Sequence, residues 1–211
     1  MKTYRKYLAA VAFLGLTLAL PCRSAAAPGQ QTLHLKFMGL TGQVTFDSFD
    51  VSGCVETLVF LQAIDGRIKL IRRPEVTSNA SVFIGQFDNC TFTQLLAAFG
   101  SATLPDIAFQ IDKQLTSATL NTTIEVFDSV SNTSFPVDLS VNWTGTGQSV
   151  NEKDHFMLRV PGFRVNATFA GSFRPATASG SVTAGATNFS PGPGGLPELD
   201  SVTIGELDVF H

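Results

Sequence analysis

The sequence predicts an all-β protein. The expected fold is an antiparallel β-sandwich of jelly-roll or immunoglobulin-like plan, with roughly ten to twelve strands and one disulfide. Three observations carry this prediction. Apolar and polar residues alternate with period two over much of the chain, turn-forming dipeptides separate the alternating segments, and two cysteines follow an apolar leader. Because each such sheet has one apolar face, two sheets would bury these faces against each other. An outer-membrane barrel is the less favoured alternative, because the mature chain has no Tyr and only one Trp for the aromatic girdles of such a barrel, and it has a predicted disulfide.

The chain begins with the pattern of a secretory signal peptide, which we assign to residues 1–26. Lys2, Arg5 and Lys6 form a basic start, and an apolar run over residues 8–20 precedes a stretch of small residues. The run is too short to span a membrane as a helix, and no later stretch is long and apolar enough to do so. We therefore predict an exported protein, secreted, periplasmic or attached to the cell surface, with no transmembrane segment in the mature chain.

The mature chain has the size of one domain and a negative charge. Cleavage leaves about 185 residues, enough to bury a full core. We expect the sandwich domain over residues 27–190, and a Pro/Gly-rich segment with a C-terminal strand or tail over residues 191–211. The leader holds four of the 14 Lys and Arg and none of the 17 Asp and Glu, so cleavage moves the net charge from -3 to about -7. Such a protein gains nothing from attraction to phosphates, and we expect no nucleic-acid partner.

Four segments alternate clearly enough to be predicted as strands. They are residues 33–37, 120–126, 135–143 and 163–169. In the third of these, Phe135, Trp143 and the apolar residues between them share one face, while polar residues occupy the other. Because Trp143 lies on the apolar face, we expect it in the core rather than in a ligand site.

The turns between the predicted strands are read from dipeptides that favour them. Asp65-Gly66 predicts a two-residue hairpin, and Pro161-Gly162 predicts a second one. Residues 129–133 would connect a third. Residues 93–99 fit a short helix or a strand, and residues 202–210 fit a final edge strand or a tail.

The two cysteines of the mature chain are predicted to form a disulfide. Cys54 and Cys90 are an even pair in an exported protein, and their closed loop would restrict the unfolded chain by roughly 3–4 kcal/mol. Two buried, unpaired thiols are the alternative. Each cysteine follows a Phe-Asp pair, Phe49-Asp50 and Phe87-Asp88, which is a faint sign of a repeated hairpin.

Asparagine is unusually often placed in an Asn-X-Ser/Thr triplet. Seven of the eight asparagines start one: Asn79, Asn89, Asn121, Asn132, Asn142, Asn166 and Asn188. In a eukaryotic secretory pathway these would be acceptors for N-linked glycans. The alternative is structural, because residues i and i+2 of a strand share a face, and a polar face built from Asn and Thr produces the same triplet.

The sequence provides no catalytic residue. The mature chain has only His34, His155 and His211, and it has neither a Gly-X-Ser-X-Gly elbow nor a His-Glu-X-X-His motif. Asp47 and Asp50 could supply oxygen ligands for calcium at a turn, and no other cofactor is expected.

One basic cluster stands out in the acidic chain. It consists of Arg67, Lys69, Arg72 and Arg73. It fits a patch for an anionic polymer or an acidic partner, or a charged edge strand that prevents sheet-to-sheet aggregation.

These observations favour a non-catalytic protein. We predict an exported binding or structural/interaction module with a protein or extracellular-matrix partner. An exposed strand over residues 202–210 could recruit that partner by strand addition. The alternative is an extracellular polysaccharide hydrolase or lyase that uses a pair of carboxylates, although no particular pair among the acids indicates it.

Overall fold

The structure is a computed structural model, and it describes residues 32–50, 52–70, 73–160, 163–189 and 198–210. The predicted signal peptide and the Pro/Gly-rich stretch before residue 198 lie outside these residues. The chain divides into two units, residues 1–30 and 31–211, and the strands of the described residues belong to the second.

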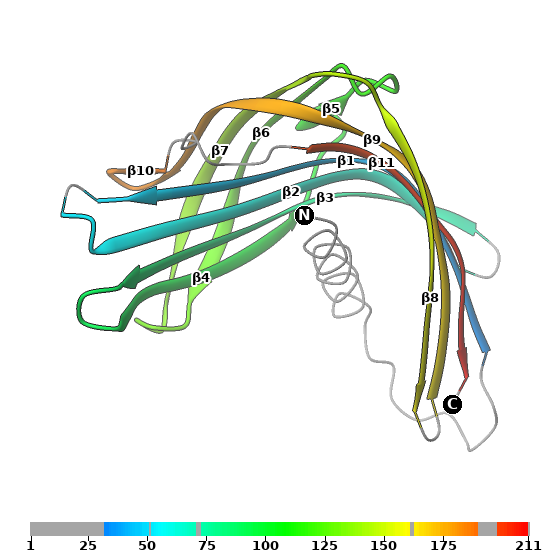
Figure 1. Ribbon diagram of the computed structural model, residues 1–211, viewed down its shortest axis with the longest axis horizontal. Coiled ribbons are helices and arrows are strands. Elements are labelled where there is room, and N and C mark those ends of the chain that lie inside the picture. Colours follow the sequence, from blue (N-terminus) through cyan, green and yellow to red (C-terminus); the bar gives the residue numbers. More distant parts are fainter. Residues whose placement is uncertain (1–31, 51, 71–72, 161–162, 190–197, 211) are drawn as a thin grey trace. The chain divides into compact units, whose positions relative to one another are not determined.

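Eleven strands make up the described part of this second unit, and all of them belong to one antiparallel sheet (Figure 1). They are β1 (Thr32–Phe49), β2 (Val55–Leu70), β3 (Arg73–Asp88), β4 (Thr93–Thr103), β5 (Phe109–Ile111), β6 (Ser117–Asp128), β7 (Thr133–Gly145), β8 (Val150–Val160), β9 (Phe163–Ala184), β10 (Thr187–Phe189) and β11 (Glu198–Phe210). The all-β class and the expected number of strands are confirmed. The segment 93–99, left open between helix and strand, is part of β4.

The sheet nearly closes on itself and is barrel-like. Neighbouring strands follow the order β10-β9-β11-β1-β2-β3-β4-β6-β5, and β7 pairs with both β6 and β9. The path β1-β2-β3-β4-β6-β7-β9-β11 therefore returns to β1. The two-sheet sandwich plan is not confirmed, because one curved sheet already turns its apolar face inward and buries it against itself.

The core consists of the inward positions that the alternation predicted. On β7, Val137, Leu139, Val141 and Trp143 are buried, while the residues between them are exposed. Trp143 is 1% exposed, its Nε1 donates a hydrogen bond of 3.0 Å to the carbonyl of Gln43, and Phe109 packs edge-on against it. The prediction that Trp143 belongs to the core is confirmed.

The hairpin predicted at Asp65-Gly66 is wrong. Strand β2 runs straight through these residues and pairs with β1 and β3 along this part of its length. Gly66 pairs with Gly39, and a Cβ on either glycine would lie 2.7 Å from an atom of the Phe37 ring. Glycine is therefore required at both positions, because the Phe37 ring packs directly on the backbone there. The other residue of the dipeptide, Asp65, accepts a hydrogen bond from the Ser78 hydroxyl on β3.

The other two predicted connections between strands, at residues 129–133 and at Pro161-Gly162, can be compared with the strand pairing. Residues 129–132 connect β6 to β7 as expected. Val160 pairs with Phe163 at the junction of β8 and β9, as a hairpin there requires, although residues 161–162 lie outside the described residues.

The C-terminal segment forms a strand, which was one of the two expectations for it, but the strand does not lie at an edge. Strand β11 lies between β1 and β9 and pairs with both of them. Strand addition along this segment is therefore not available, because its hydrogen-bonding groups on both sides face neighbouring strands.

Within the described part of the chain, no helix is long and apolar enough to cross a bilayer.

Candidate functional site

Three similar loops and the short strand β10 gather at one end of the sheet, which we call the loop end. The loops connect β1 to β2, β3 to β4 and β6 to β7, and Figure 1 shows the first two beside β10 at the left. Each loop begins with a Phe-Asp pair: Phe49-Asp50, Phe87-Asp88 and Phe127-Asp128. The first two pairs stand out in the sequence because a cysteine follows each of them, whereas the third has no nearby cysteine and was not predicted.

In the first two loops, the aspartate binds the backbone of its own loop. Asp50 accepts hydrogen bonds from the Ser52 hydroxyl at 2.7 Å and from the Val55 N–H at 2.9 Å. Asp88 accepts hydrogen bonds from the N–H groups of Cys90 and Thr91. Bonds from Ser52 lower the pKa of Asp50, and bonds from Thr91 lower the pKa of Asp88, because they favour the ionised form.

In the third loop, Asp128 also reaches another strand. Its carboxylate accepts hydrogen bonds from the Ser131 hydroxyl at 2.6 Å and from the N–H groups of Val130 and Ser131. It accepts a fourth, at 3.0 Å, from the Ala97 N–H on β4. The bonds from Ser131 and Ala97 lower the pKa of Asp128 to about 2. This carboxylate therefore stays ionised and holds β4 against β6.

The predicted disulfide between Cys54 and Cys90 is confirmed, and it joins the first two loops. The two Cα atoms are 5.3 Å apart, and the Asn89 N–H donates a hydrogen bond to the carbonyl of Cys54. Asp88 lies close to both sulfurs, within 4.8 Å. The sulfurs are bonded to each other, so this group does not offer thiolate ligands to a metal.

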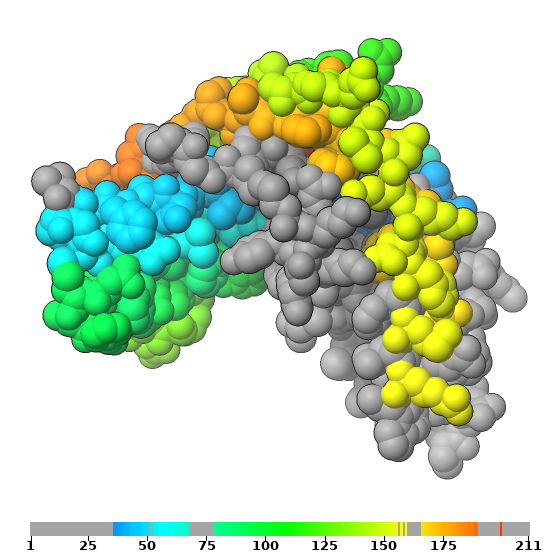
Figure 2. Space-filling view, viewed as in Figure 1, coloured from blue at the N-terminus to red at the C-terminus, as the bar shows by residue number. Residues whose placement is uncertain are grey.

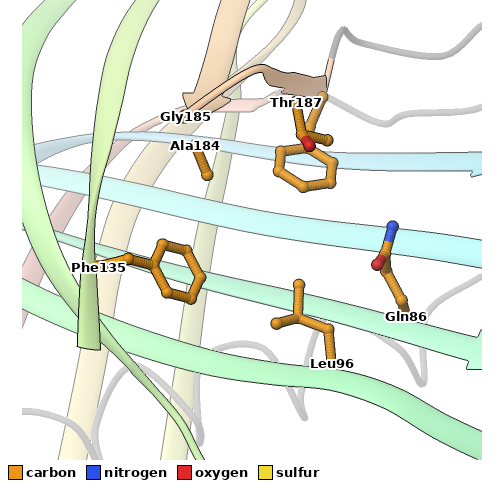
Figure 3. Close-up of a pocket in the computed structure, with 7 residues that line it drawn as sticks. Gln86, Leu96, Phe135, Ala184, Gly185 and Thr187 are labelled. Atoms are coloured by element: carbon orange, nitrogen blue, oxygen red, sulfur yellow. The ribbon is translucent and has the colours of Figure 1, made fainter. Parts of the chain in front are cut away.

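A pocket of about 370 Å³ opens at the loop end (Figure 3). Its lining comes from four parts of the sheet and consists of Gln86, Leu96, Phe135, Ala184, Gly185, Thr187 and Phe189. Leu96 and Phe135 continue the inward rows of β4 and β7, so the pocket is the open end of the apolar interior. Phe189, which is buried, forms the wall on the β10 side.

The polar groups of this pocket are an amide and a hydroxyl. The Gln86 Nε2 donates a hydrogen bond of 3.0 Å to the Thr57 hydroxyl, which orients the amide. In Figure 3, the amide oxygen of Gln86 points toward the other residues that line the pocket. None of the seven lining residues has a titratable side chain, so the pocket offers apolar contacts and hydrogen bonds but no acid or base.

The two aspartates predicted to bind calcium lie in different elements, Asp47 on β1 and Asp50 in the loop that follows it. Asp47 lies on the outer face of β1 and pairs with Leu58, whereas both carboxylate oxygens of Asp50 are hydrogen-bonded within their own loop. Among the described residues, they are not part of a group of three ligating side chains. Calcium binding at this pair stays a prediction.

The basic cluster lies at the end of β2 that is remote from the loop end. Arg67 is exposed on β2, Lys69 pairs with Pro74, and Arg73 pairs with Leu70, while Arg72 lies outside the described residues. The interpretation as a charged edge strand is wrong for Arg67 and Lys69, because β2 is paired there with both β1 and β3. Arg73 lies in the first part of β3, which among the described residues pairs with β2 alone. An anion patch stays a prediction.

The seven Asn-X-Ser/Thr triplets occupy different environments. Five of the asparagines are exposed: Asn89, Asn121, Asn132, Asn142 and Asn188. Asn79 is half-buried, and the Oδ1 of Asn166 is buried without a hydrogen-bond partner among the described residues. Asn121 accepts a hydrogen bond from Ser140 on the neighbouring strand, as expected for a polar strand face. Glycosylation at these positions stays a prediction.

Comparisons with known proteins do not assign the chain to a family. No protein-family model and no curated protein matches it. Among solved structures, it is similar to a crystal structure described as a putative AttH from Nitrosomonas europaea, with 12% identity and a TM-score of 0.25. The match covers 90% of this chain and 57% of that chain, so this chain spans less than two thirds of the other's length. At this TM-score, the similarity carries no argument.

Proposed function

We propose that this protein is an exported, non-catalytic binding module whose ligand site is the pocket at the loop end. The observation that carries the proposal is the lining of the pocket. Leu96, Phe135 and Phe189 provide apolar walls, and Gln86 and Thr187 provide hydrogen-bonding groups. This is the composition of a site for a small, mainly apolar molecule with one or two polar groups.

Two features support export. Residues 1–26 have the pattern of a signal peptide, and the Cys54–Cys90 disulfide is the kind of bond that persists in an oxidising compartment.

The alternative function predicted from the sequence, a polysaccharide hydrolase or lyase, has less support. Its mechanism needs two carboxylates that face a substrate across a cleft. At the loop end, Asp50, Asp88 and Asp128 all direct carboxylate oxygens to the N–H or hydroxyl groups of their own loops. Their role is therefore explained by loop structure, and the pocket beside them favours binding.

The test is a titration of the mature protein with N-phenylnaphthylamine, a neutral apolar fluorophore. We expect a saturable increase in fluorescence. The Ala184→Phe variant fills the pocket and should weaken binding about tenfold or more, which corresponds to about 1.4 kcal/mol. Ala186→Phe is the matched control, because Ala186 is exposed in the turn that directly follows Ala184 and does not line the pocket.

Two results would contradict the proposal. The first is a fluorophore signal that does not saturate or that is equal in the two variants. The second is the release of reducing ends when the protein is incubated with soluble polysaccharides, since this would show catalysis.

A further inference from the structure

Two neighbouring inward rows of the sheet end in a polar pair at the pocket of the loop end, on the left of the molecule in Figure 2. On β3, Val82 and Ile84 are buried, and Gln86 takes the next inward position. On β2, Val59 is buried in the same way, and Thr57, which pairs with Gln86, takes the next inward position. An amide and a hydroxyl therefore follow apolar side chains in both rows, and the pocket has a polar side at the end of an apolar interior.

The hydrogen bond between these two residues orients the amide of Gln86. Its Nε2 donates to the Thr57 hydroxyl at 3.0 Å, and its oxygen points toward the other residues that line the pocket (Figure 3). No group of the described residues donates a hydrogen bond to this oxygen, although an amide oxygen can accept two. The pocket therefore presents an oriented hydrogen-bond acceptor that a ligand can satisfy.

A β-bulge fixes the backbone that carries Gln86 and Leu96. These two lining residues pair with each other, and the register between β3 and β4 shifts directly beyond them, where Leu95 is the extra residue. The Gln94 side chain bridges the shift, because its Nε2 donates to the carbonyl of Gln86 at 2.8 Å and to that of Leu96 at 2.6 Å. One side chain outside the pocket thus holds two residues of its wall, and the acceptor has a fixed place.

The pocket has no positive charge to offer a ligand. None of its lining side chains is charged, and the stretches of sequence that supply them, 74–112, 114–152 and 175–211, contain no Lys or Arg. The loop end carries the carboxylates of Asp50, Asp88 and Asp128. An anionic head group in the pocket would lose its hydration, gain no cation and face like charges.

We infer that the pocket binds uncharged, mainly apolar molecules that carry a hydroxyl group, and that the amide oxygen of Gln86 selects them by accepting the hydroxyl hydrogen bond. The inference rests on the proposed function, because it concerns the same pocket. Thr57 is a positioning residue, since it holds the amide with its oxygen toward the ligand. Phe135 and Phe189 contact the apolar part. Fatty acids and other anionic amphiphiles are excluded, although they have the same apolar chains.

The first measurement is the displacement of bound N-phenylnaphthylamine at pH 7.4 by three ligands of equal chain length: 1-octanol, its methyl ether and octanoate. The ether keeps the oxygen but has no O–H to donate, and octanoate carries a negative charge. We expect octanol to displace the fluorophore at a concentration about tenfold lower than octanoate requires, because the charged group must be desolvated without a partner.

The second measurement compares the ratio of the displacement constants of ether and alcohol between protein variants. Differences between the two ligands in water cancel in this comparison. In Gln86→Leu the ratio should fall about fivefold to tenfold, which is the effect of one lost hydrogen bond. Thr57→Val should lower the ratio by a smaller factor, because the amide keeps its oxygen but loses its orientation. Gln110→Leu is the matched control, since Gln110 is exposed on β5 and does not line the pocket.

The outcomes distinguish this inference from the proposed function. Saturable binding of the fluorophore to Gln86→Leu shows that the pocket of this variant is intact. Octanoate that displaces as well as octanol, or a ratio that Gln86→Leu and Thr57→Val leave unchanged, would overturn the inference while the proposed binding function stands. A fluorophore that does not bind saturably to the unmodified protein would remove both.

Discussion

At the scale of single residues, Asp128 has the largest structural role among the loop-end acids. Its carboxylate is buried, it caps the loop between β6 and β7, and it binds the Ala97 N–H of β4. Strands β4 and β6 share only two register pairs, Ala98 with Asp128 and Phe99 with Phe127. The side chain of Asp128 therefore adds a bond at the place where the sheet has the fewest backbone bonds.

We predict that Asp128→Asn lowers the thermal unfolding midpoint by several degrees at neutral pH. Folding lowers the pKa of this carboxyl from 3.8 to about 2. Its stabilisation is therefore fully present above pH 4 and is lost as the pH falls toward 2. The gap between the midpoints of the unmodified protein and the variant should shrink over this pH window in a calorimetric series. Asp106→Asn, in an exposed loop position, should not produce such a gap.

At the scale of elements, strand β2 shows why a turn-forming dipeptide can lie inside a strand. Asp65-Gly66 has the composition of a tight turn, but the Phe37 ring of β1 packs against the backbone at Gly66 and Gly39. Gly66 is needed because it has no Cβ and so leaves space for the Phe37 ring, and not because it can adopt the backbone conformation of a turn. Its neighbour Asp65 is held by Ser78 of β3, which stabilises the extended conformation.

We predict that Gly66→Ala destabilises the protein by about 1–3 kcal/mol, because the new Cβ would overlap the Phe37 ring. Phe37→Leu should also destabilise by itself, through lost burial. The double variant should be less destabilised than the sum of the two, since the smaller side chain makes room for the methyl group. Urea unfolding of the four proteins measures this coupling, and strictly additive losses would contradict the proposed ring-to-backbone contact.

At the scale of the whole sheet, closure depends on a close approach of β4 and β6. Beyond Phe99, the next residue of β4 is Gly100, and a Cβ there would lie 2.4 Å from the carbonyl oxygen of Glu125. The backbone of Gly100 thus lies directly against the backbone of Glu125 and the side chain of Val126, although the strands have no further register pairs there. Gly100 therefore permits the contact between β4 and β6 through which the sheet closes on itself.

We predict that Gly100→Ala forces β4 away from β6 and costs about 1–3 kcal/mol or more. The loss should be accompanied by faster hydrogen exchange at β4 amides than in the unmodified protein, while exchange in β2 changes less. Ser101→Ala is the matched control on the same strand, because Ser101 is exposed and its substitution adds no atom near β6. Equal exchange in the two variants would show that this contact does not control closure.

The amino-acid pattern by itself determined which face of a strand is buried. The alternation from Phe135 to Trp143 predicted the core correctly, because i and i+2 lie on one face whatever the strand pairs with. The cysteine pair was equally predictable, since only two cysteines follow the predicted signal peptide and they have one pairing available to them. The bond from Asp128 to β4 could not be predicted, because its partner there, Ala97, is distant in sequence.

Tertiary structure alone decided what each strand packs against. One-sided sheets can bury their apolar faces against a second sheet or against themselves, and both solutions produce the same alternation. The choice made here depends on the pairing of β11 between β1 and β9, and on the narrow contact of β4 with β6. These contacts join residues far apart in the chain, so no local pattern records them. The same holds for the pocket at the loop end, whose lining comes from β3, β4, β7 and the segment from the end of β9 through β10.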